Sequence, residues 1–270
     1  MDVSIIIINY NTFDLTCNCI QSIYDKVRDL SYEIILVDNA STETPAHEFL
    51  KRFPNLILVD SPENVGFSRG NNLGLSFAQG KFALLLNSDT ELKNNAVLLC
   101  KMFLDKNQDV AACGSKLLFP NGVVQHNCQR FPSIKYKLFE LLRLQKFLPK
   151  AVGGRVLLGS FFDHDSVAYP DWIWGTFFMF RKRLLEELPE KKLDDSFFMY
   201  GEDMEWCRQF RNRGYRTAFV PAAEIVHHMG MSKGPKTQSM EKNLEIFLSR
   251  NYSSIQRRII RFLDRALTVG

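Results

Sequence analysis

The chain lacks cysteine pairs with the spacing of a zinc site. No two of its cysteines have the Cys-x-x-Cys spacing that is typical of structural zinc sites. We therefore expect no zinc site. We expect most of the cysteines to be reduced core residues of a cytoplasmic protein. The six cysteines are Cys17, Cys19, Cys100, Cys113, Cys128 and Cys207.

Long apolar runs are also missing. No stretch approaches the roughly 20 residues that a membrane span needs. Met1 and Asp2 lead directly into an apolar stretch without a basic region, so we expect no signal peptide. The net charge of +4 is too small to indicate a nucleic-acid partner. These features favour a cytoplasmic protein, either free or peripheral at the inner face of the cell membrane.

The sequence has neither a Gly-x-Gly-x-x-Gly motif after its first apolar run nor a P-loop. It does alternate buried-type apolar runs with helical segments, which is typical of an α/β fold with a mostly parallel central sheet flanked by helices. Such a sheet has the outline of a nucleotide-binding fold. Without either motif, the phosphates of a bound nucleotide must be held in another way, and a divalent cation is the simplest. The expected strands are 3–8, 33–37, 55–59 and 82–87, and the expected helices are 13–27, 45–52, 68–78 and 94–107.

Polar residues follow three of these strands, at Asn9, Asp38 and Asp89. Such residues also form turns, so any one of them alone has two readings. The carboxyl ends of parallel strands meet at one sheet edge, where open α/β sheets bind their ligands. Three polar positions at that edge favour a binding site, with Asp89 as a metal ligand and Asp38 as an acceptor for a base or ribose. Thr12 is expected to cap the first helix.

Four short motifs, taken in order, resemble the family 2 glycosyltransferases, and most of all their bacterial rhamnosyltransferase branch. The resemblance covers roughly residues 3–235. It implies the GT-A fold, a nucleotide-diphosphate sugar donor and inversion at the anomeric carbon. The motifs are Ile7-Ile8-Asn9-Tyr10-Asn11, Val37-Asp38-Asn39-Ala40-Ser41, Asn64-Val65-Gly66-Phe67-Ser68-Arg69-Gly70-Asn71-Asn72 and Leu86-Asn87-Ser88-Asp89-Thr90.

The resemblance also implies roles for single residues. Asn9 and Tyr10 would line the nucleotide pocket, and Arg69 would lie near the base or the diphosphate. Asn87-Ser88-Asp89 stands where the family has its Asp-x-Asp motif. Asn87 replaces a carboxylate with a neutral amide, but an amide oxygen is still a ligand for a hard cation. The expected cofactor is Mg²⁺ or Mn²⁺, held chiefly by Asp89, with Asn87 and Ser88 contacting the nucleotide.

A second group of motifs lies on the acceptor side. Trp174 and Gly175 fit the family's strand beside the donor sugar, whereas Trp172 is expected to pack in the core. Glu202 and Asp203 begin a helix, whose dipole should lower the pKa of carboxylates in its first turn. Capping of the helix N-terminus would by itself explain why two acidic residues stand at this position. The resemblance instead assigns Asp203 as the general base that inverting transfer requires and Glu202 as an acceptor contact.

Two histidines follow an expected edge strand at 215–221. The family often has a histidine here that reaches the metal or the diphosphate. The alignment gives this role to His227, with His228 as the alternative. Ser232 and Lys233 are expected to close over the diphosphate.

Two basic amphipathic segments lie outside these motifs. Residues 135–148, inside an insertion at 128–169, are expected to form one helix or two short ones. This insertion would be a loop that binds the acceptor, a contact with a membrane, or an ordinary helical segment at the surface. From Gln238 onward a single long helix is expected, with an apolar face and several arginines. Its stretch 240–267 can lie on an anionic membrane, pack on the domain or pair with a second subunit in a homodimer.

We expect a GT-A domain over 1–236 and a helical extension over 237–270. Residues 1–92 would bind the nucleotide, and 93–236 would bind the acceptor and catalyse the reaction. The leading hypothesis is a bacterial, metal-dependent hexosyltransferase that builds a cell-surface polysaccharide on a saccharide or lipid-linked acceptor, with dTDP-rhamnose as the first candidate donor and a UDP-hexose as the second. A sugar-phosphate nucleotidyltransferase and a non-catalytic glycan-binding module remain the alternatives.

Overall fold

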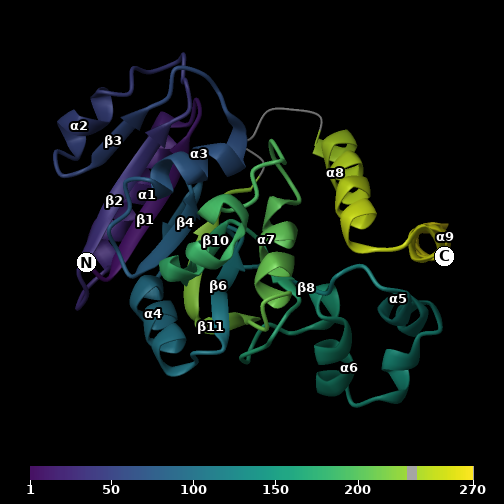
Figure 1. Cartoon of the computed structure of the whole chain (residues 1–270). Helices are drawn as coiled ribbons and strands as arrows, with labels where there is room; N and C mark the ends of the chain where they lie inside the picture. Colours follow the sequence, from purple (N-terminus) through teal and green to yellow (C-terminus); the bar gives the residue numbers. More distant parts are fainter. Residues whose placement is uncertain (230–235, 270) are drawn as a thin grey trace.

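A mixed β-sheet runs through the centre of the molecule (Figure 1). The computed structural model describes residues 1–229 and 236–269. Within these residues nine strands form the sheet, in the order β3-β2-β1-β4-β10-β6-β11-β5, with β7 paired to β6. They are β1 (Val3–Asn9), β2 (Tyr32–Asp38), β3 (Ile57–Asp60), β4 (Phe82–Asn87), β5 (Thr90–Leu92), β6 (Val110–Leu118), β7 (Val124–Gln125), β10 (Phe177–Arg181) and β11 (Arg216–His227). A separate pair joins β8 (Cys128–Gln129) to β9 (Trp172–Ile173).

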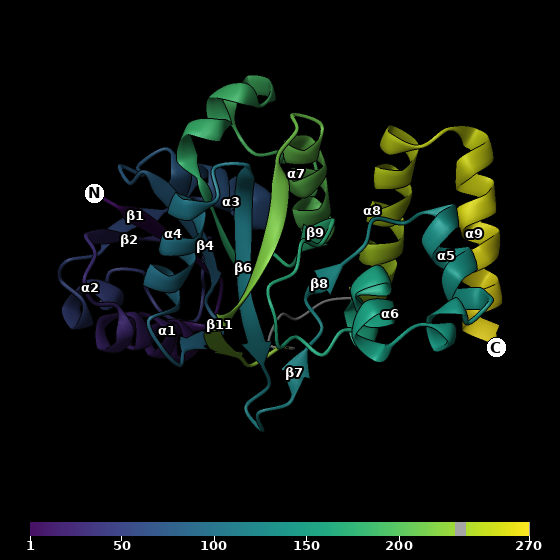
Figure 2. The ribbon, with the colours of Figure 1, turned by 90° about the horizontal axis from the view of Figure 1, so that it is seen from below.

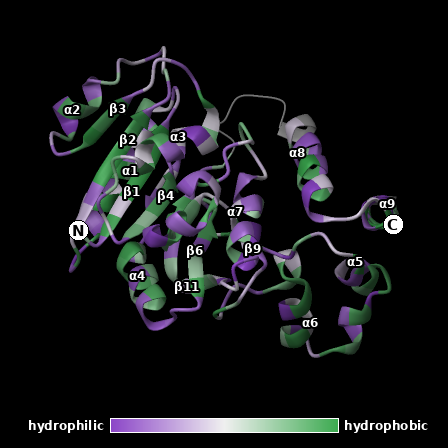
Figure 3. Cartoon of the chain, viewed as in Figure 1, coloured by the Kyte–Doolittle hydropathy of each residue, from purple (hydrophilic) through white to green (hydrophobic). Residues whose placement is uncertain are grey.

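The first four strands of that order are parallel and apolar (Figure 3). Side chains alternate between the two faces of a strand, and in β1 both faces are buried. Ile5 and Ile7 belong to one core cluster, whereas Ile6 belongs to another. The pairing places Asn9 beside Asp38, and Ile8 beside Asn87. The predicted buried strands and their shared polar edge therefore follow from continuous apolar runs that end in polar residues.

Helices cover both faces of the sheet. The cluster with Ile5 includes residues of α1 and α4, and the cluster with Ile6 includes residues of α3 and α7. Gly74 lets α3 approach the sheet, because a Cβ at this position would lie 2.5 Å from Cγ2 of Ile6. These helices are α1 (Phe13–Lys26), α2 (Glu48–Arg52), α3 (Gly66–Leu75), α4 (Ala96–Lys106) and α7 (Glu202–Arg211). The predicted α/β class with a flanked, mostly parallel sheet is confirmed.

Some predicted elements were wrong. Thr12 does not cap α1, because its hydroxyl donates to Asn9 Oδ1 at 3.0 Å instead. The strand expected at 215–221 continues to His227. Its residues 216–220 pair with β6 on one side and have an isolated bridge, from Phe219 to Ala168, on the other, whereas β5 joins β11 at residues 225–227. The pairing of β11 with β6 shifts register between Val220 and Glu224. Pro221, which lacks an N–H to donate, falls inside that irregularity.

The insertion folds into short helical pieces on the far side of the sheet from β3 and α2 (Figure 2). The basic segment forms α5 (Ile134–Leu141) and the 3-10 turn η1 (Leu144–Phe147), separated by Arg143 at a positive φ of 53°. The helix α6 (Lys150–Leu157) follows and packs against η1 and α5.

The single C-terminal helix was also a wrong prediction. The chain forms α8 (Lys236–Asn251) and α9 (Ser254–Val269). Ser253 N donates to Gln256 Oε1 at 3.0 Å and Gln256 N donates to Ser253 Oγ at 3.3 Å. This reciprocal pair is a capping box, which starts a new helix. Among the described helices, none is both long enough and apolar enough to cross a membrane.

The helix α8 packs on the body of the protein through a cation surrounded by aromatic rings. The Arg208 guanidinium of α7 lies 4.3 Å from the ring centre of Phe131, 5.7 Å from that of Phe247 and 5.4 Å from that of Tyr252. It also donates to the Tyr252 hydroxyl at 2.7 Å. Phe247 is fully buried and belongs to the core cluster that contains Ile6. These contacts join α8 to α7.

Candidate active site

A hydrogen-bonded cluster forms where β1 and β2 end. Asn9 Nδ2 donates to Asp38 Oδ1 at 2.6 Å and to Ser41 Oγ at 2.9 Å. Ser41 donates its hydroxyl to Asp38 Oδ1 at 2.7 Å and its backbone N–H to Asp38 Oδ2 at 2.9 Å. Thr16 Oγ1 donates to Asn9 Oδ1 at 2.8 Å. Asn9 is buried, and its amide holds the Asp38 carboxylate in one orientation. The sequence analysis did not predict a role for Thr16, although Thr16 lies one helical turn after Thr12.

Two other predicted nucleotide residues are open to solvent. Tyr10 follows β1 and its side chain is 47% exposed. Arg69 is exposed on α3, and no ion-pair partner for it exists within residues 1–229 and 236–269. Both side chains are therefore accessible to a ligand, whereas the Asn9 side chain is buried against Asp38.

The turn from β4 to β5 carries Asn87, Ser88 and Asp89. Asn87 Oδ1 is buried and accepts no hydrogen bond from the described part of the chain. Ser88 Oγ lies 3.2 Å from Thr12 Oγ1. Asp89 Oδ1 lies 3.4 Å from Nε2 of His227, at the end of β11, and the side chains of both residues are largely buried.

A glutamine that sequence reasoning missed holds the other side of His227. Gln125 Oε1 lies 2.7 Å from His227 Nδ1, and Gln125 Nε2 donates to the His227 carbonyl at 2.8 Å. This arrangement favours the tautomer with the proton on Nδ1, leaving the Nε2 lone pair toward Asp89. His228 instead places its Nε2 2.8 Å from Glu91 Oε1. Of the two histidines, His227 is the one beside Asp89.

These side chains suit a divalent cation. Asp89 and Asn87 offer oxygens, and His227 offers a ring nitrogen, a mixed set that Mn²⁺ accepts and that Mg²⁺ accepts in part. The orphaned Asn87 oxygen is a second observation in favour, because buried acceptors normally have a partner. The described residues hold no cluster of three or more His, Cys, Asp or Glu side chains suited to a metal. The protein would thus supply part of a coordination shell, with oxygens of a diphosphate and water to complete it.

Asp203 lies in the first turn of α7, which begins after Gly201 at φ 92°, a conformation that favours glycine. Asp203 Oδ2 accepts from the Gly175 N–H at 3.0 Å, and Oδ1 accepts from the Met204 N–H at 2.8 Å. The next carbonyl, that of Thr176, accepts from the Asn87 N–H at 3.0 Å. Backbone hydrogen bonds therefore bring Asp203 to the sheet edge that carries Asn87.

Burial controls the ionisation of the acidic pair. Desolvation raises the pKa of Asp203 to about 6, although the N–H groups of Gly175 and Met204 act in the opposite direction. Burial, together with the Asp203 charge, raises the pKa of Glu202 well above its usual range, and Glu202 Oε2 has no hydrogen-bond partner among the described residues. The expected lowering of the pKa by the helix dipole is wrong, because desolvation outweighs it here.

The two tryptophans have different surroundings. Trp174 is partly buried against the core cluster beneath α1 and α4. Gly175 is buried, and a Cβ on it would lie 3.6 Å from Asp203 Cβ. Trp172 packs in the other core cluster and donates its indole N–H to the Arg130 carbonyl at 3.1 Å, as expected of a structural residue. Ser232 and Lys233 lie outside the described residues.

Residues 4–188 match the sequence family described as "Glycosyl transferase family 2". The chain is 23% identical over 262 residues to an N-acetylglucosaminyl-diphospho-decaprenol L-rhamnosyltransferase of Mycobacterium tuberculosis, covering 86% of this chain and 79% of the relative. It is also 23% identical over 261 residues to the low-salt glycan biosynthesis hexosyltransferase Agl10 of Haloferax volcanii, covering 93% of this chain and 76% of that relative.

Solved structures share the fold at low identity. A crystal structure of GalNAc-T7 with UDP, GalNAc and Mn²⁺ superposes with a TM-score of 0.65 and 15% identity over 92% of this chain, which spans 48% of that structure. S. aureus TarS 1-349 superposes with a TM-score of 0.59 and 16% identity over 99% of this chain and 71% of that structure. This chain belongs to glycosyltransferase family 2 and has the GT-A fold.

Proposed function

We propose that the protein transfers a hexose, with inversion, from a nucleotide-diphosphate sugar to a hydroxyl group of a saccharide or lipid-linked acceptor, and that Asp203 is the general base. The single observation that carries this proposal is the setting of the Asp203 carboxylate. Two backbone N–H groups orient it, a backbone link ties it to Asn87, and burial raises its pKa to about 6. A base of that pKa is ionised at neutral pH and still has a strong affinity for a proton.

The reaction divides among the chain's own residues. Asp38, held by Asn9 and Ser41, would accept hydrogen bonds from the base or ribose, and Tyr10 and Arg69 would contact the nucleotide from solvent-exposed positions. Asp203 would take the proton from the acceptor hydroxyl as this oxygen attacks C1 of the sugar, opposite the diphosphate. A Mg²⁺ or Mn²⁺ ion at Asp89 and His227, with Asn87, would neutralise charge on the leaving diphosphate.

On the acceptor side, we propose that Trp174, Gly175 and Glu202 line the place where the two sugars meet. The Gly175 backbone N–H donates to Asp203, which supports a place for the donor sugar next to the proposed base. In this scheme residues 1–92 bind the nucleotide and Ser88 contacts it, residues 93–236 serve the acceptor and catalysis, and residues 237–270 form the helical extension.

The names of the relatives provide a ranking of the candidate substrates. One is named as an L-rhamnosyltransferase that acts on a diphospho-decaprenol sugar, and another as a hexosyltransferase of glycan biosynthesis. We therefore rank dTDP-rhamnose first as donor and a UDP-hexose second, with a lipid-linked saccharide as acceptor in the synthesis of a cell-surface polysaccharide.

A donor panel tests this function. The purified chain would be incubated with Mn²⁺ or Mg²⁺ and each nucleotide sugar, with and without a polyprenyl-diphosphate saccharide, while nucleoside diphosphate release is measured. We expect release with one donor, stimulated by the acceptor. Pyrophosphate release from a nucleoside triphosphate and a sugar 1-phosphate would instead identify a nucleotidyltransferase. Binding of glycans without turnover of any donor would identify a glycan-binding module.

The raised pKa of Asp203 predicts the acid limb of the pH profile. The base must be unprotonated to accept the hydroxyl proton, so kcat/KM should fall about tenfold for each pH unit below about 6 and should level off above it. Initial rates measured between about pH 4.5 and 8 with saturating metal would give the midpoint. A profile that stays flat down to about pH 4.5 would contradict the assignment of Asp203.

Gln125 offers a test of the metal site that does not depend on turnover. Gln125→Met keeps the length of the side chain but removes the two hydrogen bonds to His227. We expect Mn²⁺ affinity to drop about 10–100-fold, as for other outer-shell partners of a ligating histidine. Calorimetric Mn²⁺ titration would measure the affinity, and ¹⁵N NMR of the histidine rings would report the tautomer. Gln129→Met, at a glutamine that donates to the His126 carbonyl, is the matched control. Unchanged affinity in Gln125→Met would contradict a role for His227 as ligand.

A further inference from the structure

Two segments that are far apart in the sequence pack into one unit at the edge of the molecule (Figure 2). We call α5, η1, α6 and α9 the distal helical unit. The helix α9 packs along α5, and Lys137 of α5 forms an ion pair with Asp264 of α9. Ile260 and Leu263 of α9 are buried at this contact side. One face of α9 therefore packs on α5, and a second face, which carries Arg257 and Arg261, lies beside α8.

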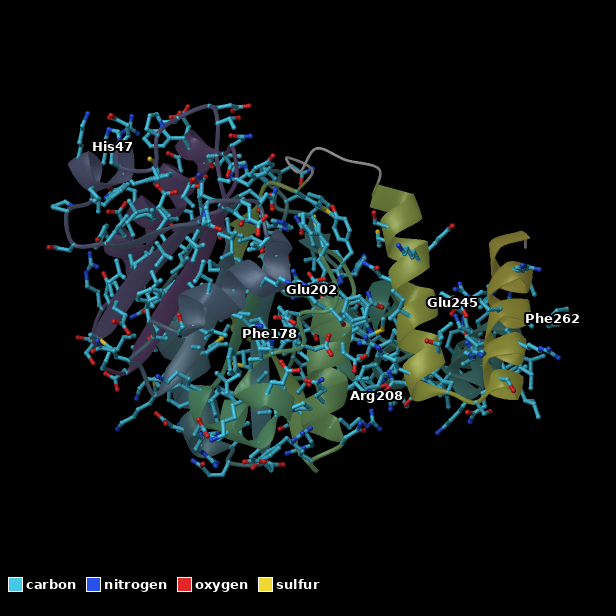
Figure 4. The ribbon with its side chains drawn as sticks, turned by 45° about the horizontal axis from the view of Figure 1, so that its top comes forward. His47, Phe178, Glu202, Arg208, Glu245 and Phe262 are labelled. Carbon is cyan, nitrogen blue, oxygen red and sulfur yellow. The ribbon has the colours of Figure 1, made fainter. Side chains whose placement is uncertain are left out.

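The remaining surface of α9 is apolar along one stripe. Ile255, Ile259 and Phe262 recur at helical spacing, so they lie on one face of α9. Ile255 is 70% exposed and Phe262 is 71% exposed, and Figure 4 shows Phe262 on the outer side of the helix. The same unit exposes further large apolar side chains on α5, η1 and the connection between them. These are Leu138, Leu141, Leu142, Leu144 and Phe147.

Positive charge lies beside the stripe. Arg258 and Arg265, both exposed, are one turn to either side of Phe262. They line a groove of about 420 Å³ along α8 and α9, together with Arg257, Arg261, Phe262, Ser254 and Glu245. Glu245 pairs with Arg257 at 3.4 Å and with Arg261 at 2.6 Å. Glu245 is therefore shared by Arg257 and Arg261, and the groove is lined by more arginines than acids.

The charge of the whole chain is strongly divided. Residues 134–157 and 254–269 contain ten of the 34 lysines and arginines but two of the 30 acidic residues. They carry a net charge of +8, so the rest of the chain carries −4. An exposed apolar stripe next to concentrated positive charge complements a bilayer with anionic headgroups, where apolar side chains enter the acyl boundary and arginines bind phosphates.

We propose that the distal helical unit docks the protein on anionic phospholipid membranes, with Phe262 and Ile255 inserted and with Arg258 and Arg265 on the headgroup phosphates. Charge favours lipid over a second copy of the chain. A symmetric pairing through this face would bring the arginine-rich surfaces of two chains together without matching acids. The proposal rests on the surface alone and holds whichever sugar is transferred.

Vesicle flotation tests this docking with the full chain. We expect the protein to float with phosphatidylcholine vesicles that contain phosphatidylglycerol, to stay unbound with phosphatidylcholine alone, and to dissociate as salt is raised. Phe262→Ser should weaken binding about tenfold, as loss of one inserted aromatic side chain does. Phe77→Ser, at an exposed phenylalanine between α3 and β4, should leave binding unchanged.

The arginines are tested separately. Arg258→Gln combined with Arg265→Gln should weaken binding to phosphatidylglycerol vesicles about 25-fold, since each basic residue near such a surface contributes a factor of about five. Lys26→Gln combined with Lys51→Gln, on α1 and α2, makes the same change in net charge and should have little effect. Circular dichroism would confirm that each variant is folded.

Three results would overturn the proposal. The first is the absence of binding to phosphatidylglycerol vesicles, and the second is binding that Phe262→Ser and the arginine pair leave unchanged. The third is a dimer in sedimentation velocity that Phe262→Ser dissociates while vesicle binding is absent. None of these results depends on transferase activity, so they are distinct from a failure of the proposed reaction.

Discussion

Asp203→Asn should lower kcat by roughly 10²–10⁴-fold, the range that a positioned general base contributes. The substitution preserves the shape of the side chain. Its amide oxygen can still accept a hydrogen bond from Gly175 or Met204, so the local backbone should remain in place. The acceptor hydroxyl then loses the group that takes its proton. Binding of the nucleotide, measured by calorimetry with the free diphosphate, should stay within about twofold of the parent because Asp203 does not face that ligand in the proposed scheme.

The same variant should be more stable at neutral pH. Burial raises the Asp203 pKa from 3.8 to about 6, so the folded state binds this proton more tightly than the unfolded state does. The resulting stability is fully present below about pH 4 and is lost as pH rises through about 6. At about pH 7.5 the buried charge disfavours folding, and Asn removes it. We expect Tm to rise by about 2–4 °C, the shift that about 1 kcal/mol gives in a chain of this size.

Asp14→Asn is the matched control for both measurements. Asp14 also lies in the first turn of a helix, but it is exposed. Its substitution should leave kcat and Tm nearly unchanged. Full activity of Asp203→Asn would contradict the general-base role, and a Tm that falls at neutral pH would contradict the desolvation argument.

Asp89→Asn should abolish most metal-dependent activity. Asp89 is the only carboxylate in the proposed metal site, whose other members are His227 and the neutral Asn87. We expect Mn²⁺ affinity to fall by about 100-fold or more. Loss of a residue that only supports a ligand costs up to about 100-fold, and loss of the ligand itself should cost at least as much. Transfer should fall in parallel and recover in part at high Mn²⁺ concentration, since the diphosphate and His227 still offer ligands.

Glu91→Gln controls for the loss of a nearby carboxylate. Glu91 lies on β5, two residues from Asp89, and pairs with His228 rather than His227. Its Mn²⁺ affinity, followed by electron paramagnetic resonance, should match the parent. If Asp89→Asn binds Mn²⁺ like the parent, or if Glu91→Gln loses binding equally, the ion does not sit at Asp89.

The sequence predicts the parallel half of the fold and the polar edge because both depend on local pattern. An apolar run ending in Asn9 or Asp38 is visible in one dimension, and the topology of parallel strands then brings those ends together. The C-terminal break was missed because apolar spacing continues through it, although the Ser253 and Gln256 capping box was present in the sequence. The extension of β11 to His227 depends on its pairing with β5, a tertiary contact that local pattern does not reveal.

The site was only partly predictable for the same physical reason. Gln125 belongs to a two-residue strand, and its contact with His227 arises from tertiary pairing across 102 positions of sequence. Burial of Asp203 is likewise a property of the packed molecule, and it reverses the direction of the pKa shift that a helix start alone suggests. Residue types predict chemistry, whereas the partners that hold a ligating side chain and the burial of a carboxylate depend on the fold.

The aromatic rings around Arg208 should couple the unfolding of α7 to that of the C-terminal helices. Arg208 belongs to the helix that carries Asp203, and two of the rings around it, Phe247 and Tyr252, come from the C-terminal end of the chain. Removing those rings would leave a partly buried cation without its neighbours and would open a void where Phe247 packs. The helix α7 and the C-terminal helices should therefore melt in one cooperative step, and a force that pulls on the C-terminal helices would be transmitted to α7 and to Asp203.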